Sequence, residues 1–371
     1  MKTIVISAVN LKVGGTLTIM RHCLRYLSAL AETGGYRIVA LVYRKELAFF
    51  PHIEYIEMVW PKKTWLNRLW CEYVTMLQLS KKLAPVYLWL SLHDTTPTVR
   101  AEKRVVYCHN SFPYYQWKMR EWWFAPKIVL FALLSKHIFR VNIHKNNYLI
   151  VQQEWMKREF IRSFGLQGDH IIVAPPVLSK EKVDDLRIIN ATGQGVYSFL
   201  FAASPDSHKN FECICQAVKI LKEQSGIVDF KVYITVKGDE NKYAKWLFRK
   251  WGKKISQVEF IGFLDRKSLY AYYQQSHCLV FPSKVETWGL PITEFAVFGK
   301  PMLLADLPYA HETAGGCGKV AFFNPDEPHE LADQMQRLIR GDESFLMTTE
   351  KNTIPAPVAW SWQELFEILL A

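Results

Sequence analysis

Compact hydrophobic runs alternate with amphipathic stretches along the chain. The run at 4–9 is apolar at nearly every position, which is typical of a parallel strand buried on both faces, and the pattern returns at 278–281. The stretch at 16–32 instead places its apolar residues at the three- and four-residue spacing of a helix. This alternation predicts an α/β protein with doubly wound parallel sheets.

The same pattern continues to the end of the chain. Further strands are predicted at 37–43, 55–59, 86–91, 104–108, 148–151, 197–203, 230–236, 258–263 and 302–305. Further helices are predicted at 65–83, 127–142, 155–164, 211–223, 266–275, 291–299 and 360–370, the last with Ser361 as its cap.

A chain of 371 residues is too long for one ordinary core and suits two domains. Pro175-Pro176 cannot continue a helix, and the polar residues that follow predict a linker at 176–195. The expected domains are therefore 1–175 and 196–355, with the helix at 356–371 returning to the first domain.

The stretch 278–306 carries the strongest functional pattern. A strand ends in a loop with Glu286 and Gly289-Leu290, and a helix carrying Glu294 begins there, before a second strand. The first turn of such a helix has free N–H groups and attracts anions. Two carboxylates beside an anion site suit a ligand that combines phosphate with hydroxyl groups, such as a nucleotide sugar.

The segment E-T-W-G-L-P-I-T-E at 286–294 resembles the E-x7-E motif of the retaining GT-B glycosyltransferases of group 1 (GT4-type), with Trp288 where Phe is usual. The resemblance spans nearly the whole chain and is strongest over 196–324. It implies a GT-B fold, in which two Rossmann-like domains face a central cleft. It also implies transfer of a sugar from a nucleotide-sugar donor with retention, without a metal.

The resemblance also implies roles for residues of the second domain. Glu286 would bind the donor sugar near the reacting carbon, with a covalent nucleophile as its alternative role, and Glu294 would bind the ribose. The N–H groups around Gly289 and Leu290 would face the diphosphate, and Phe263 would pack against the nucleobase.

Lys209 follows the strand at 197–203 and resembles the lysine of the family's R-x4-K-G/N element, which neutralises the leaving diphosphate. The family's arginine falls at Ser204 in this chain. Either another group supplies that charge, with His208 as one candidate, or donor binding is weaker.

Two features of the first domain resemble the family's donor- and acceptor-facing residues. His109 follows a predicted strand and would lie near the sugar and acceptor, whereas a structural hydrogen-bonding role is expected for His93. Gly14 and Gly15 precede a helix, where the backbone can approach the donor diphosphate, although a plain tight turn explains them equally well.

Charge is unevenly distributed. Residues 1–180 carry 25 Lys and Arg against 11 Asp and Glu, whereas the remainder carries 21 against 24. This predicts an anionic partner, such as a membrane surface or a lipid diphosphate, with a soluble basic domain as the alternative. No zinc-finger or RNA-binding motif supports nucleic acid as the partner. Aromatic and basic residues at 114–140 suit a membrane interface, although their apolar neighbours could equally form core.

No apolar run reaches the length of a membrane span, and 1–10 does not resemble a signal peptide. Seven cysteines without paired C-x-x-C units favour a reducing cytosol, and the sequence has no Asp-x-Asp or other metal motif.

We therefore expect a cytoplasmic glycosyltransferase, peripheral on the inner face of the membrane. It would need no cofactor and would extend a glycan or lipid-linked acceptor in bacterial surface polysaccharide synthesis. The alternatives are a degenerate GT-B subunit that only binds a partner, for which Ser204 speaks, and a nucleic-acid-binding protein.

Overall fold

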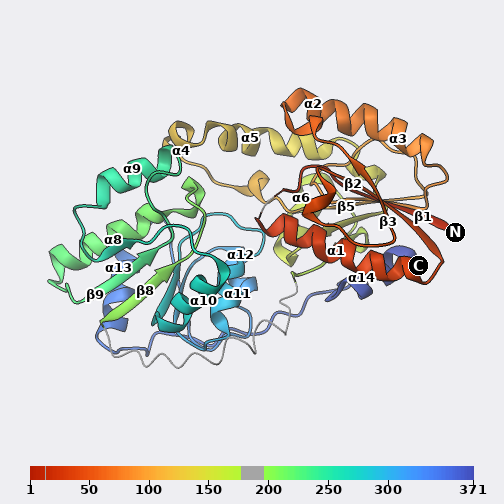
Figure 1. The fold of residues 1–371 in the computed structure, drawn as a ribbon. Coiled ribbons are helices and arrows are strands. Elements are labelled where there is room, and N and C mark those ends of the chain that lie inside the picture. Colours follow the sequence, from red (N-terminus) through yellow and green to blue (C-terminus); the bar gives the residue numbers. More distant parts are fainter. Residues whose placement is uncertain (13, 177–195) are drawn as a thin grey trace. The chain divides into compact units, whose positions relative to one another are not determined.

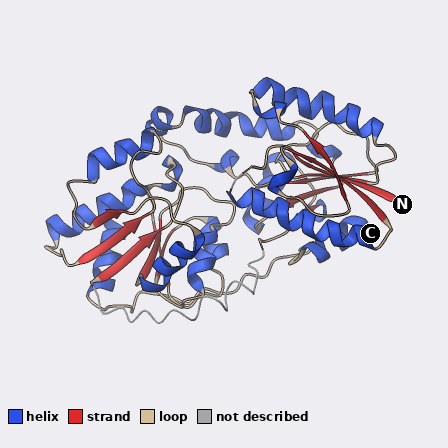
Figure 2. Cartoon of the chain, viewed as in Figure 1, coloured by secondary structure: helices blue, strands red, loops and turns tan. Residues whose placement is uncertain are grey.

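A computed structural model describes residues 1–12, 14–176 and 196–371, so most of the expected linker lies outside the described residues. The chain divides into two compact units, which are drawn in Figures 1 and 2 and described separately here. Unit 1 comprises Met1–Pro113, Leu133–Val177 and Ile354–Ala371, and unit 2 comprises Tyr114–Ala132 and Leu178–Thr353. The chain therefore changes unit outside the linker twice. Tyr114–Ala132 groups with unit 2 rather than with the rest of 1–175, and Ile354–Ala371 returns to unit 1.

Unit 1 is built on a seven-stranded parallel sheet in the order β3-β2-β1-β4-β5-β6-β7. Its strands are β1 Lys2–Ala8, β2 Tyr36–Val42, β3 Ile53–Glu57, β4 Leu88–Ser91, β5 Lys103–Tyr107, β6 Tyr148–Val151 and β7 Ile171–Val173. The short β7 was not anticipated from the sequence.

Helices cover both faces of this sheet (Figure 1). Ile4 and Ile6 contribute to the core that also contains residues of α1 and α14, whereas Val5 belongs to a separate core with Met76 of α3. The helices assigned to unit 1 are α1 Gly14–Glu32, α2 Trp65–Trp70, α3 Met76–Lys82, α6 Glu154–Phe164 and α14 Trp362–Leu370. A π-helical turn at Cys71–Thr75 joins α2 to α3, so the single helix expected at 65–83 is interrupted.

The C-terminal helix α14 packs within unit 1. The rings of Tyr26 and Phe366 stack with centroids 5.3 Å apart, and the Tyr87 hydroxyl donates a 2.9 Å hydrogen bond to the Leu370 carbonyl. Ser361 caps the helix by accepting from the Glu364 N–H, as its sequence predicts.

Unit 2 contains a six-stranded parallel sheet in the order β10-β9-β8-β11-β12-β13. Its strands are β8 Tyr197–Phe201, β9 Phe230–Ile234, β10 Val258–Phe260, β11 Cys278–Phe281, β12 Met302–Ala305 and β13 Val320–Phe323. Its helices are α4 Met119–Phe124, α8 Phe211–Gln224, α9 Lys242–Trp251, α10 Arg266–Gln275, α11 Leu290–Ala296, α12 Pro308–Thr313 and α13 Pro328–Ile339. Helix α5, Pro126–Arg140, begins in unit 2 and ends in unit 1.

The strand order of unit 2 reverses direction between β8 and β11, which pair directly through Cys278–Phe199 and Leu279–Leu200. Ligands of open α/β sheets bind at the carboxyl ends of the strands flanking such a point. The loops that leave β8 and β11 carry Lys209 and Glu286. The topology therefore brings together two residues that are 77 positions apart in the sequence.

Candidate active site

Lys209 and Glu286 form an ion pair at this switch point. The Nζ atom of Lys209 lies 2.5 Å from Oε1 of Glu286, and the two side chains are 15% and 14% exposed. Both side chains are thus mostly buried, but a small part of each remains in contact with solvent, and their opposite charges compensate each other. An anionic ligand that reached Lys209 would compete with the glutamate for the ammonium group.

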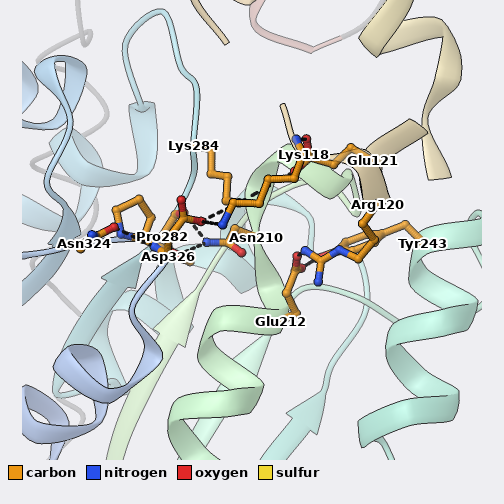
Figure 3. Close-up of polar contacts among 11 residues, drawn as sticks. Lys118, Arg120, Glu121, Asn210, Glu212, Tyr243, Pro282, Lys284, Asn324 and Asp326 are labelled. Carbon is orange, nitrogen blue, oxygen red and sulfur yellow. Dashed lines mark hydrogen bonds and ion pairs between the residues drawn. The ribbon is translucent and has the colours of Figure 1, made fainter. Parts of the chain in front are cut away.

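Asn210 holds the Lys209 loop in place. Its backbone has a φ of 61°, in the left-handed region that asparagine tolerates better than most residues. Its side-chain amide donates to the carbonyls of Pro282 at 3.3 Å and Pro325 at 2.8 Å (Figure 3). One buried side chain therefore connects the loops that follow β8, β11 and β13.

The position of the family's arginine offers no cation. Ser204 is exposed, and its hydroxyl donates a 2.7 Å hydrogen bond to the carboxylate of Asp206. Burial, together with the neighbouring charge of Lys209, lowers the pKa of His208 well below its ordinary value. His208 is therefore neutral, which speaks against the suggestion that it replaces the missing charge.

Gly289 forms the turn from which α11 begins. Its φ is +89°, and a Cβ at this position would lie 3.2 Å from Cδ1 of Ile292. The loop is tied down on both sides of this turn, because the Trp288 indole donates to Thr293 Oγ1 at 2.7 Å and the Thr313 hydroxyl donates to the Trp288 carbonyl. The backbone around Gly289 and Leu290 is thus held in a fixed conformation.

Glu294 lies on α11 and is largely buried. Tyr273 donates a 3.2 Å hydrogen bond to Glu294 Oε2, and the Arg266 guanidinium lies 3.8 Å from Oε1. Burial and this carboxylate raise the pKa of Tyr273 well above its ordinary value, so its hydroxyl stays protonated and can donate.

Phe263 follows β10 in the loop that ends at the Asp265 cap of α10. Its side chain is 90% exposed. An aromatic ring with so little contact to its own protein leaves both of its faces available to a planar ligand.

The segment 114–132 packs against unit 2 beside these loops (Figure 3). Lys118 Nζ lies 2.6 Å from Oδ1 of Asp326, and Lys284 Nζ lies 2.9 Å from the same oxygen. Burial alone would raise the pKa of Asp326, but the hydrogen bonds from the two lysines outweigh it and the pKa is lowered. The Lys284 N–H in turn donates to the His208 carbonyl at 2.9 Å, so this cluster abuts the Lys209 loop.

A second anchor of the same segment is more deeply buried. Arg120 pairs with the buried carboxylate of Glu212, which also accepts from the Tyr243 hydroxyl (Figure 3). Phe124 adds aromatic packing, with its ring centroid 5.0 Å from that of Trp246. These contacts explain why 114–132 groups with unit 2. They were not predicted, because a pair 92 residues apart leaves no local pattern.

The candidates of unit 1 lie at the carboxyl ends of its strands. The His109 N–H donates a 2.6 Å bond to Asp94 Oδ1, and burial lowers the pKa of the imidazole to about 3. Both ring nitrogens are buried without a hydrogen-bond partner among the described residues. His93 lies deeper, with Nε2 2.7 Å from Ser7 Oγ and Nδ1 3.3 Å from Glu72 Oε1.

Gly14 and Gly15 form the first turn of α1 rather than a loop before it. Gly14 has a φ of +69°, which requires glycine, whereas Gly15 has no such constraint. A Cβ on either residue would meet nothing within 4 Å. The helix expected at 16–32 therefore begins two residues earlier than predicted.

Within the residues described, no group of three or more His, Cys, Asp or Glu side chains could hold a metal ion. Over the same part of the chain, no helix is long and apolar enough to cross a membrane.

Part of the chain is similar in sequence to known glycosyltransferases. An Escherichia coli O-antigen chain mannosyltransferase B is 20% identical over 223 residues, which are 58% of this chain and 57% of that protein. The match thus spans little more than half of the relative's length. Residues 183–353, which include Lys209, Glu286 and Glu294, match the family glycosyl transferases group 1.

Solved structures extend the likeness to both units. An α,α-trehalose-phosphate synthase from Burkholderia vietnamiensis has a TM-score of 0.66 at 13% identity, covering 100% of this chain and 99% of that chain. The Anabaena protein HepE in complex with UDP-glucose has a TM-score of 0.58 at 14% identity, covering 93% and 92%. The chain has the GT-B fold. The two parallel sheets confirm the expectation of two Rossmann-like domains.

Proposed function

We propose that this chain is a retaining, GT4-type glycosyltransferase that transfers a sugar from a nucleotide-sugar donor to a glycan or lipid-linked acceptor. The observation that carries the proposal is the Lys209–Glu286 pair at the switch point of the unit 2 sheet. It lies in the stretch that matches the group 1 glycosyltransferases, and the similar HepE structure contains UDP-glucose.

In the proposed donor site, the diphosphate displaces Glu286 from Lys209. The lysine and the N–H groups around Gly289 and Leu290 then face the phosphate oxygens. Glu294 accepts hydrogen bonds from the ribose hydroxyls, and Phe263 stacks on the base. The freed Glu286 carboxylate accepts from the hydroxyls of the donor sugar.

The transfer step requires stabilisation of the negative charge that develops on the leaving diphosphate. The bond between the anomeric carbon and the phosphate oxygen breaks with its electron pair moving to that oxygen. The acceptor hydroxyl attacks the anomeric carbon on the same face and gives its proton to the departing phosphate oxygen, so the configuration is retained. Lys209 stabilises the diphosphate charge, which requires no metal. The imidazole of His109, neutral at physiological pH, orients the donor or acceptor by hydrogen bonding.

The acceptor belongs to bacterial surface polysaccharide synthesis in this proposal. An O-antigen mannosyltransferase among the relatives supports this assignment. The positive charge of residues 1–180 favours an acceptor presented at an anionic membrane surface, on its cytoplasmic side.

Ligand-observed NMR in EDTA tests the proposal with a panel of UDP-, GDP-, dTDP- and ADP-sugars. The expected result is saturation transfer to one nucleotide family without metal, weakened in Glu294→Ala and unchanged in Asp333→Asn, an exposed carboxylate on α13. If folded protein bound none of these sugars, the proposed function would fail in favour of a degenerate GT-B subunit.

A further inference from the structure

Helix α2 presents its apolar side to solvent. Its four large hydrophobic residues are exposed: Trp65 by 56%, Leu66 by 77%, Leu69 by 38% and Trp70 by 62%. At 100° per residue they fall within an arc of about 140°. A helix of a soluble protein normally turns such a face to the core.

The polar side of the same helix points inward. The Asn67 amide donates to the Trp60 carbonyl at 3.2 Å, and Arg68 pairs with Glu72, whose side chain is buried. Arg68 also donates to the His93 carbonyl at 3.0 Å, and Thr64 caps the first turn. These bonds fix the rotation of the helix, so α2 cannot roll to bury its tryptophans without exposing a buried carboxylate.

A cluster of cations adjoins the start of α2. Lys62 and Lys63 end the turn that leads into the helix, and Lys62 Nζ donates to the Asn10 carbonyl at 2.8 Å. Lys12 Nζ lies 3.6 Å from the ring centroid of Tyr43. The positive charges of Lys12 and Arg68 help to lower the pKa of Lys62, after burial, so the three cations are near enough to repel one another. In the described part of the chain, no carboxylate forms an ion pair with Lys12, Lys62 or Lys63.

We propose that α2 docks unit 1 onto an anionic phospholipid bilayer. The tryptophans and leucines of α2 enter the boundary between headgroups and acyl chains, and Lys12, Lys62 and Lys63 meet the lipid phosphates. Tryptophan is favoured at this depth, and unpaired lysines add electrostatic attraction to anionic lipid.

The chemistry favours lipid over a second copy of the chain. A symmetric dimer through α2 would place the same cationic cluster beside the same face of its twin, where like charges disfavour association. The docking rests on the proposed function in one respect, because an enzyme whose acceptor is linked to a lipid must reach the membrane surface. The stretch 114–140 is the other surface that the sequence suggests, and the test below compares the two.

Co-sedimentation of the full chain with vesicles tests the docking. We expect binding to vesicles of phosphatidylglycerol mixed with phosphatidylcholine, little binding to phosphatidylcholine alone, and loss of binding as salt rises. Trp65→Ser/Trp70→Ser should weaken the partition coefficient by at least about tenfold, and Lys12→Gln/Lys62→Gln by a similar factor. Trp360→Ser is the matched control, since Trp360 is 51% exposed elsewhere in unit 1 and should have no effect.

Three outcomes would overturn the docking. Equal binding by wild type and Trp65→Ser/Trp70→Ser would do so. Loss of binding only in Trp122→Ser/Trp123→Ser would assign the surface to α4 instead. A wild-type dimer in light scattering that Trp65→Ser/Trp70→Ser dissociates would make the face a contact between copies. Nucleotide-sugar binding measured on the same samples reports separately on the proposed function.

Discussion

Lys209 Nζ lies 2.5 Å from Glu286 Oε1, so the cation proposed for the diphosphate and the carboxylate proposed for the donor sugar form an ion pair with each other. The pair keeps an unpaired charge from being left in a largely sheltered site. In the proposed donor site, a diphosphate replaces the carboxylate at Lys209 and releases Glu286 toward the sugar. The proposal therefore makes donor binding and the placement of Glu286 a single event.

Removing the Glu286 carboxylate should separate binding from turnover. We expect Glu286→Gln to abolish sugar transfer, because an amide cannot stabilise positive charge at the anomeric carbon. Nucleotide affinity should be equal to that of the wild type or higher, because Lys209 loses the carboxylate that competes with the diphosphate. Glu294→Ala should instead weaken nucleotide affinity, by about tenfold for one lost charge-assisted bond. Turnover and titration on both variants provide the test, and wild-type turnover in both would refute the two assignments.

Ser204 offers a gain-of-function experiment. Arginine at this position would add a second cation to the loop that carries Lys209, and we expect Ser204→Arg to raise nucleoside diphosphate affinity by about three- to tenfold. The gain is limited because Asp206 accepts a hydrogen bond from residue 204 and would compete for the guanidinium. Ser204→Gln controls for size without charge. An equal effect of both substitutions would show that position 204 does not face the diphosphate.

The Arg120–Glu212 pair should dominate the attachment of 114–132. Glu212 is buried, so Arg120→Met would leave its carboxylate with Tyr243 alone and lower the free energy of unfolding by about 3 kcal/mol. Arg120→Met/Glu212→Gln should recover much of that loss, because the buried charge is gone as well. Urea unfolding of the two single variants and the double variant gives the coupling energy. Additive effects would mean that the two side chains do not interact in solution.

Asp326 should contribute a pH-dependent part of the stability. The pKa of Asp326 is lowered in the folded protein, so its stabilisation is complete above the unfolded pKa of about 3.9 and is lost as pH falls through the lower folded value. The stability difference between wild type and Asp326→Asn should therefore be largest near neutral pH and shrink below about pH 4. Urea unfolding at several pH values measures it, with Asp333→Asn as the exposed control. A constant difference down to pH 2 would contradict the ion pairs to Lys118 and Lys284.

Local pattern was sufficient for most strands of the two sheets, although β7 and β13 were not predicted. Buried parallel strands such as β12 need consecutive apolar residues, and Met302–Ala305 was placed correctly for that reason. The E-x7-E segment could be interpreted because strand, glycine turn and helix are all encoded within it. Asn210 and Gly289 carry residue types that positive φ angles favour.

Other features depend on partners that are distant in sequence. Arg120 and Glu212 give no sign of each other, so the division of the chain at Tyr114 could not be predicted. Periodicity predicted the helix at α2 but not which side of it faces the core. The polar side faces inward because Arg68 pairs with the buried Glu72 and because a π-helical turn follows the helix. Which groups of a loop remain charged also depends on burial, as His208 illustrates.

Calorimetric titration of the preferred nucleoside diphosphate into Lys209→Met and its control Lys219→Met is the most direct test of the proposed donor site. Lys219 lies on α8 and pairs only with the exposed Glu223 at 3.6 Å in the described structure. We predict that Lys209→Met lowers affinity by about 10- to 100-fold, since it removes a charge-assisted contact of about 1.5–3 kcal/mol and leaves Glu286 to repel the phosphates. Lys219→Met should match wild type. Equal affinity in all three proteins would place the nucleotide elsewhere and contradict the proposed function at its centre.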